Sequence, residues 1–301
     1  MIFGGQKTSI PPQTAPLAPG YAVQLGSSCN IQGGSIGSYN LVKSTGNLTL
    51  GTNIYSGGTI QLANSNMVTG KITAANLTTL PSPLPAGSTI LSIGSSTNIA
   101  GNIDVNGNIL IGGGTVSGIV THPSGTTYSG PVPGGGNIIG QPTLPGLPDM
   151  PAITNFPGAG STPINATKTI LAGSSWGDVT LGGNKTLTLS GTGVYVFNSI
   201  KNSGTSNDFA FDFKNQPGTI KIYVHGDVDL GKVKASIIND GGTGASRIYF
   251  ETHGKGTASN PVAFNIANGS SGSSSKWLGS VWAPYAAINV GSGTGSTDFT
   301  G

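Results

Sequence analysis

Residues 219–230 read TIKIYVHGDVDL, and this stretch decides the fold. Its apolar side chains fall on every second residue: Ile220, Ile222, Val224, Val228 and Leu230. Its polar and aromatic side chains fall between them: Lys221, Tyr223, His225, Asp227 and Asp229. Because strict alternation places the two sets on opposite faces of a β-strand, we predict one strand with an aliphatic inner face and a polar outer face.

Residues 247–253, RIYFETH, repeat the pattern, with Ile248 and Phe250 inward and Tyr249 and Glu251 outward. If the Ile-Tyr pairs that start at 222 and 248 lie side by side on successive coils, one coil is 26 residues long. Solenoid units span roughly 20–45 residues, so the two strands fit successive coils. The alignment places Tyr223 beside Tyr249, and His225 beside Glu251, on strands about 4.8 Å apart. Val194 and Val196 are expected to form another inward pair.

Between residues 21 and 130, shorter alternations recur, such as NLTLG at 47–51 and GTIQL at 58–62. Each is a short run with period two, and the runs are separated by Gly, Asn and Ser, the residues that turns favour. One turn of such a chain cannot bury its apolar face alone, so neighbouring turns stack into a solenoid. A β-sandwich gives similar turn signals and stays open as an alternative.

The composition excludes several classes of protein. Gly accounts for 51 of 301 residues and charged residues for only 8%, which disfavours helices and ordinary charged disorder. The net charge of +3 is not clustered, so we expect no nucleic-acid partner, and no apolar run is long enough to span a membrane. The single cysteine, Cys29, permits no intrachain disulfide and no cysteine-based metal site. No cofactor is predicted.

Proline and charge divide the chain into four expected segments. Residues 1–20 are an irregular lead-in, and residues 21–130 are Gly/Asn-rich solenoid coils. Residues 131–167 are a proline-rich linker or arm, because proline cannot donate to a β-ladder. Residues 168–301 form a β-helix region with longer strands.

Three stretches of this last region resemble bacterial secreted β-helix surface domains of the choice-of-anchor or adhesin type. They are GTGVYVF at 191–197, IKIYVHGDV at 220–228 and LGSVWAPYAAINV at 278–290, in which GSVWAP at 279–284, followed by FTG at 299–301, is the most specific piece. The resemblance, which extends distantly to ice-binding proteins, implies an extracellular, cell-surface location and an all-β, parallel right-handed β-helix with irregular proline-rich segments. It also implies that the natural chain continues past Gly301, leaving a coil edge open or capped by another element.

The outward rows supply the candidate binding residues: Tyr223, His225, Asp227, Tyr249, Glu251 and Trp282. Aromatic rings on an exposed sheet suit sugar rings, whereas the same residues can also be an unliganded outer face or an aromatic stack. Only Asp227, Asp229 and Glu251 are expected to converge as acids, and no catalytic or metal-ligating residue is predicted.

These observations predict a non-catalytic surface protein, a β-helical adhesin or stalk with weak multivalent contacts to surface glycans or to other copies of the protein. A polysaccharide-active β-helix enzyme is one alternative. An ice-binding protein is the other, and it requires threonines in register on successive coils. Thr186 and Thr188 form one Thr-Leu-Thr and Thr49 is a further single threonine, but no third repeat keeps the register.

Overall fold

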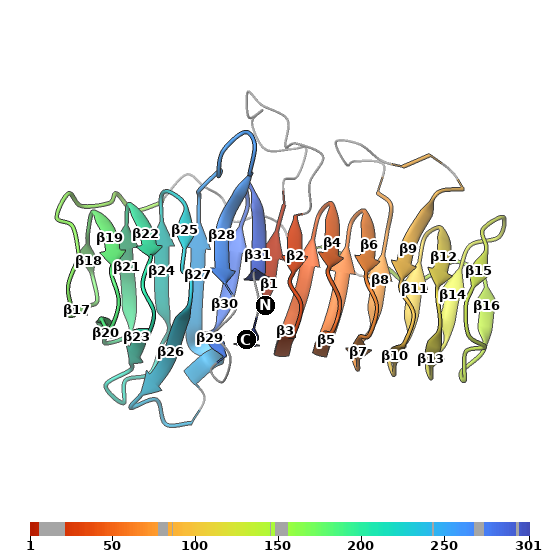
Figure 1. Ribbon diagram of the computed structural model, residues 1–301, viewed down its shortest axis with the longest axis horizontal. Helices are drawn as coiled ribbons and strands as arrows, with labels where there is room; N and C mark the ends of the chain where they lie inside the picture. The colour runs from red at the N-terminus through yellow and green to blue at the C-terminus, as the bar shows by residue number, and fades with distance from the viewer. Residues whose placement is uncertain are drawn as a thin grey trace.

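The computed structural model describes residues 1–5, 22–77, 84–85, 87–144, 146–147, 156–242, 244–267, 274–292 and 295–301. Within them the chain forms an elongated solenoid of stacked strands (Figure 1). Every ladder between named strands is parallel, and the one short helix of the described residues is the 3-10 turn η2 (Gly244–Arg247). This confirms the all-β fold and the parallel β-helix, and excludes the sandwich.

Each coil places one strand on each of three faces, which we call first, second and third in chain order. The first face contains β17 (Lys168–Leu171), β20 (Thr186–Ser190), β23 (Asn207–Asp212), β26 (Val233–Ile238), β29 (Ser275–Leu278), β32 (Thr297–Thr300), the first halves of β3 (Cys29–Ser38) and β5 (Thr49–Ser56), β7 (Met67–Val68), β10 (Thr97–Ile99) and β13 (Gly114–Val116).

The second face contains β18 (Ser174–Ser175), β21 (Gly193–Phe197), β24 (Ile220–Val224), β27 (Ile248–Thr252), β30 (Ser280–Ala283), β1 (Ile2–Gly4), the second halves of β3 and β5, β8 (Ile72–Ala74), β11 (Ile103–Val105), β14 (Val120–His122) and β16 (Asn137–Ile139). The third face contains β19 (Asp178–Leu181), β22 (Ser199–Asn202), β25 (Val228–Asp229), β28 (Val262–Ala267), β31 (Ala287–Ser292), β2 (Val23–Leu25), β4 (Leu41–Ser44), β6 (Thr59–Leu62), β9 (Thr89–Ile93), β12 (Asn108–Ile111) and β15 (Tyr128–Ser129).

The two ends of the chain meet in one coil at mid-length, which we call the seam coil (Figure 1). Its three strands are β32 from the C-terminal side and β1 and β2 from the N-terminal side. β1 lies between β30 and β3, and β32 lies between β29 and β3. The expected irregular lead-in therefore begins with a strand. The edge of β32, which we expected to be open or capped by another element, is paired with β3.

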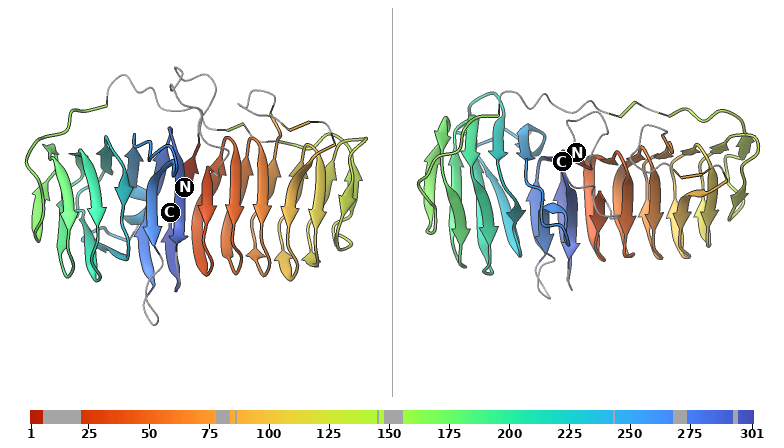
Figure 2. Two further views of the ribbon diagram at one scale, coloured as in Figure 1. Left: turned by 45° about the horizontal axis from the view of Figure 1, so that its top comes forward. Right: turned by 90° about the horizontal axis from the view of Figure 1, so that it is seen from above.

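From the seam the N-terminal half winds outward to β16, and the C-terminal half winds back from the opposite end. Residues 141–163, which we call the arm, connect the two ends, and their described parts lie along the second face (Figure 2). The expected linker at 131–167 was too wide, because β16 is still part of the solenoid and Ile164 already bridges to Val179. Proline-rich sequence suits the arm because it needs no ladder of its own.

The core is a continuous stack of inward side chains, which are aliphatic in the N-terminal half and a mixture of aliphatic and aromatic in the C-terminal half. Trp277 lies fully buried among Phe209, Phe211, Phe250 and Phe264, with ring centroids 5.6–5.9 Å from its own. Edge-to-face packing of this kind adds to the hydrophobic gain from burying large rings. Cys29 is also buried in the core, and burial raises the pKa of its thiol to about 12.

The corner between the third and first faces repeats one backbone conformation. Ser28, Asn47, Ser65 and Ser96 have φ of 59°, 54°, 64° and 57°. Short polar residues tolerate this left-handed region better than bulky ones. The repeated corner explains why Ser, Asn and Gly punctuate the alternating stretches.

The strand at 219–230 confirms the predicted facing of its first half but ends earlier than expected. Ile222 and Val224 are buried, and Tyr223 and His225 are partly exposed. The single long strand was wrong, because the chain turns a corner around Gly226, and Val228 continues on the third face. At this corner the N–H of Gly226 donates a hydrogen bond to the carbonyl of Asn198 at 2.7 Å.

Two register predictions were wrong, the one that placed Tyr223 beside Tyr249 and the one that placed His225 beside Glu251. Ile222 pairs with Phe250 rather than with Ile248, so Tyr223 lies opposite Glu251 and Lys221 opposite Tyr249. Since the shift is an even number of positions, every side chain keeps its face. Tyr223 and Tyr249 remain diagonal neighbours, with ring centroids 6.2 Å apart.

The inward pair at Val194 and Val196 was also wrong. Tyr195 and Phe197 point inward instead, and the Tyr195 hydroxyl donates to the carbonyl of Gly191 at 2.6 Å. In GVYVF both alternating sets are apolar, so the period alone could not choose between them.

We expect Ile222→Ala to lower the free energy of unfolding by about 2–5 kcal/mol, because it opens a cavity in the core where Ile222 is buried. Lys221→Ala, one residue away on the exposed side, should change it by less than about 0.5 kcal/mol. Chemical denaturation of both variants checks this, and equal effects would contradict the assigned facing.

Candidate functional site

The outward row of the second face is unusually rich in aromatic and apolar residues. It runs strand by strand through Val196, Tyr223, Glu251, Trp282, Phe3, Gly37, Tyr55, Thr73, Asp104, Thr121 and Ile138. Val196 and Phe3 point away from the core yet are buried. Outward apolar side chains need a cover, and part of that cover is the arm.

Five of the six predicted binding residues lie on the C-terminal half of this row or beside it. Tyr223, Tyr249 and Glu251 meet there, and they form a cluster with three residues that the prediction did not include. We call the six the aromatic–carboxylate cluster: Phe156, Tyr223, Tyr249, Glu251, His253 and Tyr285.

Glu251 is the centre of the cluster and is only 4% exposed. One carboxylate oxygen accepts the Tyr249 hydroxyl at 2.7 Å, and the other lies 2.7 Å from Nε2 of His253. Both oxygens therefore have partners, as a buried carboxylate requires. The alternation of side chains along one strand explains the arrangement. Tyr249, Glu251 and His253 are two residues apart along and just beyond β27, so they share its outward side.

Phe156 of the arm packs on aromatic side chains beside this carboxylate. Its ring stacks on His253, with centroids 3.7 Å apart, and lies edge-on to Tyr223 and His225 at 5.1 and 4.9 Å. His225 Nε2 lies 2.7 Å from the carbonyl oxygen of Pro157. The predicted residues Tyr223 and His225 thus contact the arm directly.

Trp282 lies on the outward side, as its alternation with Val281 and Ala283 indicated, but it is only 7% exposed. It packs with Phe3 and Tyr39, and Leu147 of the arm packs against the same group. A ring covered in this way offers no open stacking platform in the present conformation.

The expected convergence of acids was wrong. Asp229 lies on the third face and accepts from the Asn265 amide at 2.9 Å, whereas Glu251 is buried on the second face. Asp227 lies at the corner between them and accepts the N–H of Gly256 at 2.8 Å. The bend at Gly226 places Asp229 on a different face from Glu251, so the three carboxylates do not converge on one face.

A second arm contact lies on the N-terminal half. Lys71 Nζ is 2.7 Å from Asp104 Oδ2, and the other oxygen of Asp104 accepts the N–H of Thr143 at 3.4 Å. Lys71 Nζ also donates to the carbonyl of Thr143 at 3.4 Å. Sequence reasoning missed these anchors and Phe156. The aromatic residues expected on the outward side of the strands were a usable signal, because such residues need a cover.

The tyrosines of the cluster are held protonated. Burial raises the pKa of Tyr249, and its hydrogen bond to Glu251 and the charge of Glu251 raise it further. Burial and the same charge raise the pKa of Tyr223 and of Tyr285.

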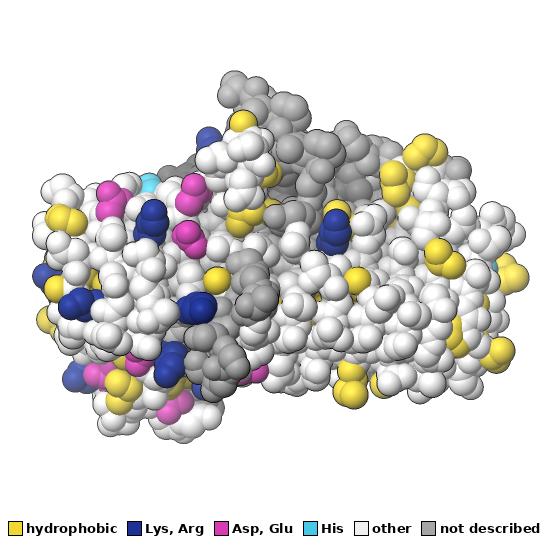
Figure 3. Space-filling view, in the orientation of Figure 1, with side chains coloured by type: hydrophobic (Ala, Val, Ile, Leu, Met, Phe, Trp, Pro, Cys, Tyr) yellow, Lys and Arg dark blue, Asp and Glu magenta, His cyan; other side chains and the backbone are white. Residues whose placement is uncertain are grey.

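The third face differs from the second. Its outward row crosses the seam without a break, and each member is at least partly exposed: Thr180, Lys201, Asp229, Asn265, Asn289, Gln24, Lys43, Gln61, Ser92, Leu110 and Ser129. Asn289 donates to Asn265 at 2.8 Å, which donates to Asp229. Charged side chains concentrate on the C-terminal half of the molecule (Figure 3).

The first face is less regular. Its C-terminal strands β17, β20, β23 and β26 form a separate ladder, and no ladder joins β26 to β29 among the described residues. Within the described residues, the third face is the continuous sheet whose whole outward row stays at least partly exposed.

The described residues contain no group of three His, Cys, Asp or Glu side chains that could hold a metal ion. No helix in the described part of the chain has the length and apolar character that crossing a membrane requires.

Comparison with protein families gives a match over most of the chain. The model of the family described as "Putative Ice-binding-like adhesive domain" matches residues 32–298. No curated protein and no solved structure matches.

Above about pH 10, the pKa of free tyrosine, we expect the free energy of unfolding to fall with rising pH. The raised pKa of Tyr249 means that the folded state keeps a proton that the unfolded state loses. Its contribution is therefore complete below about pH 10 and is lost above it. Tyr249→Phe should flatten the decline, as followed by denaturation between pH 8 and 12. An unchanged slope would show that Tyr249 is not held in this way.

Proposed function

Because the chain belongs to the family of ice-binding-like adhesive domains, we propose that it is a non-catalytic, extracellular adhesive domain whose third face binds neutral, hydroxyl-rich glycans. The observation that carries the proposal is the unbroken third-face row, which repeats an outward side chain on each of eleven parallel strands. Each contact would be weak, and the regular repetition of contacts along one rigid body would raise the overall avidity for the polymer.

The chemistry of the row supports a neutral polymer as partner. Between the seam and β15 its only charged member is Lys43, and Gln24, Gln61 and Ser92 offer donors and acceptors. Amides and hydroxyls both donate and accept, as sugar hydroxyls do. Leu110 adds an exposed apolar surface that suits the apolar face of a sugar ring.

The third face supports this role better than the predicted aromatic residues do. Tyr223, His225 and Trp282 are engaged with the arm or with its cover, and Glu251 is buried. We propose that these residues position the arm, and that Asp227 and Tyr249 belong to the same supporting structure. The placement of Asp229 and the buried Glu251 on different faces supports the non-catalytic assignment.

We expect the wild-type domain to be retained on an insoluble neutral polysaccharide such as cellulose or chitin. The double variant Gln61→Glu with Ser92→Glu places two like charges on paired third-face strands and should reduce retention at least tenfold. The matched control, Asn98→Glu with Thr115→Glu, places the same charges on paired first-face strands and should bind normally. Loss in both variants, or in neither, contradicts the third face as the contact surface.

Ice is the alternative partner that the family description raises. Thr49 and Thr115 on the first face are separated by Met67 and Asn98, so no rank of threonines runs along it. Thermal hysteresis of the wild-type domain distinguishes the two functions, and we expect none. A clear hysteresis without retention on polysaccharide would show that the ligand is ice and not a glycan.

A further inference from the structure

The N-terminal half of the solenoid ends in a strand with one open edge. β16 (Asn137–Ile139) is the last strand of the second face, and among the described residues it pairs only with β14 (Figure 1). All three of its residues are exposed. A side chain placed on Gly136, just before the strand, would meet no atom within 4 Å. No described part of the chain therefore covers this edge.

Two residues of β16 turn their backbone groups toward the open edge. The carbonyl of Gly136 and the N–H of Gly140 both bond to β14, at 3.0 and 2.9 Å. Because the peptide groups of successive residues point to opposite sides of a strand, those of Ile138 also face β14. The N–H and C=O groups of Asn137 and Ile139 then face outward, where they form a template for another strand.

The end of the solenoid around this edge is uncharged and partly apolar. The sequence contains no Asp, Glu, Lys or Arg from residue 105 to residue 148. Val132, Ile138 and Ile139 are 91%, 48% and 67% exposed, and Figure 3 shows hydrophobic side chains at this end. Natural proteins usually guard an exposed strand edge with a charge, and this edge has none, so it suits pairing with another strand.

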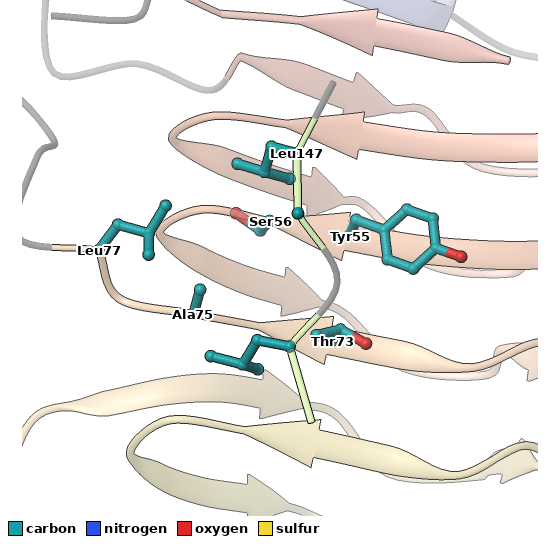
Figure 4. Close-up of a pocket in the computed structure, with 8 residues that line it drawn as sticks. Tyr55, Ser56, Thr73, Ala75, Leu77 and Leu147 are labelled. Carbon is teal, nitrogen blue, oxygen red and sulfur yellow. The ribbon is translucent and has the colours of Figure 1, made fainter. Parts of the chain in front are cut away.

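The arm does not close this end, because its described part turns back over the second face. Leu147 lies over Ser56 of β5, and both border a small cavity with Leu144 and Ala75 (Figure 4). β5 belongs to a coil nearer the seam, separated from β16 by β8, β11 and β14. The arm therefore runs from the end toward the middle of the molecule and leaves the edge of β16 open.

The opposite end of the solenoid is a poorer partner for this edge. Residues 160–164 run beside its third-face strand β19, and the N–H of Gly160 donates to the carbonyl of Trp176 at 3.1 Å. Lys168 Nζ lies 4.3 Å from the centre of the Trp176 ring. A molecule stacked on this end would remove a charge from water without supplying a partner for it. Contact between two identical, uncharged ends is favoured over contact between unlike ends.

We propose that two copies of the chain associate through the ends of their N-terminal halves, with the two β16 strands paired antiparallel about a two-fold axis. With the axis between the two Ile138 residues, Asn137 lies opposite the partner's Ile139, and the reverse. Residues that lie opposite each other in an antiparallel pair exchange two hydrogen bonds when their peptide groups face each other. The pairing therefore uses all four open backbone groups of each strand.

The side chains agree with this symmetry. Opposite residues of an antiparallel pair lie on the same side of the sheet, so the exposed Ile138 side chain packs against the partner's Ile138. A two-fold contact brings each residue close to its own equivalent, which would repel if it were charged. The absence of charged residues from 105 to 148 is thus what such a contact requires.

The contact is small, since each copy contributes one short strand and a few apolar side chains. It belongs with weak, transient interfaces, and its effect grows where many copies are held on one surface. The pairing uses the end of the solenoid and leaves the third face exposed, so it does not depend on glycan binding.

Sedimentation equilibrium of the full chain over a range of concentrations tests the proposal. We expect a reversible equilibrium between monomer and dimer. Small-angle X-ray scattering of the dimer should give a maximum dimension close to twice that of the monomer, because the two rods meet end to end. A wild-type chain that stays monomeric at the highest soluble concentration overturns the proposal, and so does a dimer no longer than the monomer.

A charge at the axis locates the contact. Ile138→Lys places like charges opposite each other and should abolish the dimer. The matched control, Leu171→Lys, places the same charge on a residue that is 69% exposed at the other end of the solenoid, and it should dimerise normally. Dimerisation that survives Ile138→Lys, or that is lost in both variants, contradicts the proposed surface.

A proline tests the backbone bonds independently of charge. Ile139→Pro removes an N–H that points to the open edge, so the ladder to β14 keeps its bonds. Each dimer loses two hydrogen bonds, and dimerisation should weaken roughly tenfold or more. Ile139→Val keeps the N–H and should dimerise like the wild type. Unchanged dimerisation of a folded Ile139→Pro variant would show that the two β16 strands do not pair in this way.

Discussion

The structure depends on the backbone pairing through the seam coil, which continues the ladder of each of the three faces across the middle of the molecule. The carbonyl of Met1 accepts the N–H of Val281 at 2.7 Å, and the N–H of Gly301 donates to the carbonyl of Gln32 at 3.1 Å. Without β1 and β32, the first and second faces would each have two unpaired strand edges at mid-length, and the inward Ile2 and Phe299 would leave a gap in the core. Two half-solenoids become one rod because three strands from opposite ends of the chain share a coil.

The arm is a consequence of this arrangement. Since both chain ends lie at the seam, the two outer ends of the solenoid must be connected along the outside. The face that docks the arm has different outward side chains from the face that does not. The second face carries Phe3, Trp282 and Tyr223 outward, whereas the third face carries mainly amides and hydroxyls between the seam and β15. A face that docks the arm and a face that meets solvent are therefore distinguished by sequence, although their backbones are alike.

Local pattern predicted much of this fold. Alternation identified the strands and the inward side of residues such as Ile222 and Phe250, because a two-residue period is a property of each strand alone. The register was missed because identical Ile-Tyr pairs were aligned, whereas the chain between β24 and β27 includes β25, β26 and η2, which set the coil length. Gly226 was read as part of a strand because one glycine does not reveal a corner.

The candidate site was predictable only in part, for a related reason. Tyr223, Tyr249 and Glu251 were grouped correctly because they alternate on neighbouring strands. Phe156, His253 stacked beneath it, and the covered state of Trp282 depend on the arm, a segment far from these strands in sequence. No local period encodes such a contact, and only the course of the arm creates it.

Native-state hydrogen exchange at the seam tests the account most directly. The amide of Val281 pairs with Met1, and that of Ile288 pairs with Ala22. Both should exchange as slowly as amides in the middle of either half, and one unfolding transition should expose them all. Rapid exchange at these amides, with the two halves unfolding in separate transitions, would show that the chain ends do not join the halves into one solenoid.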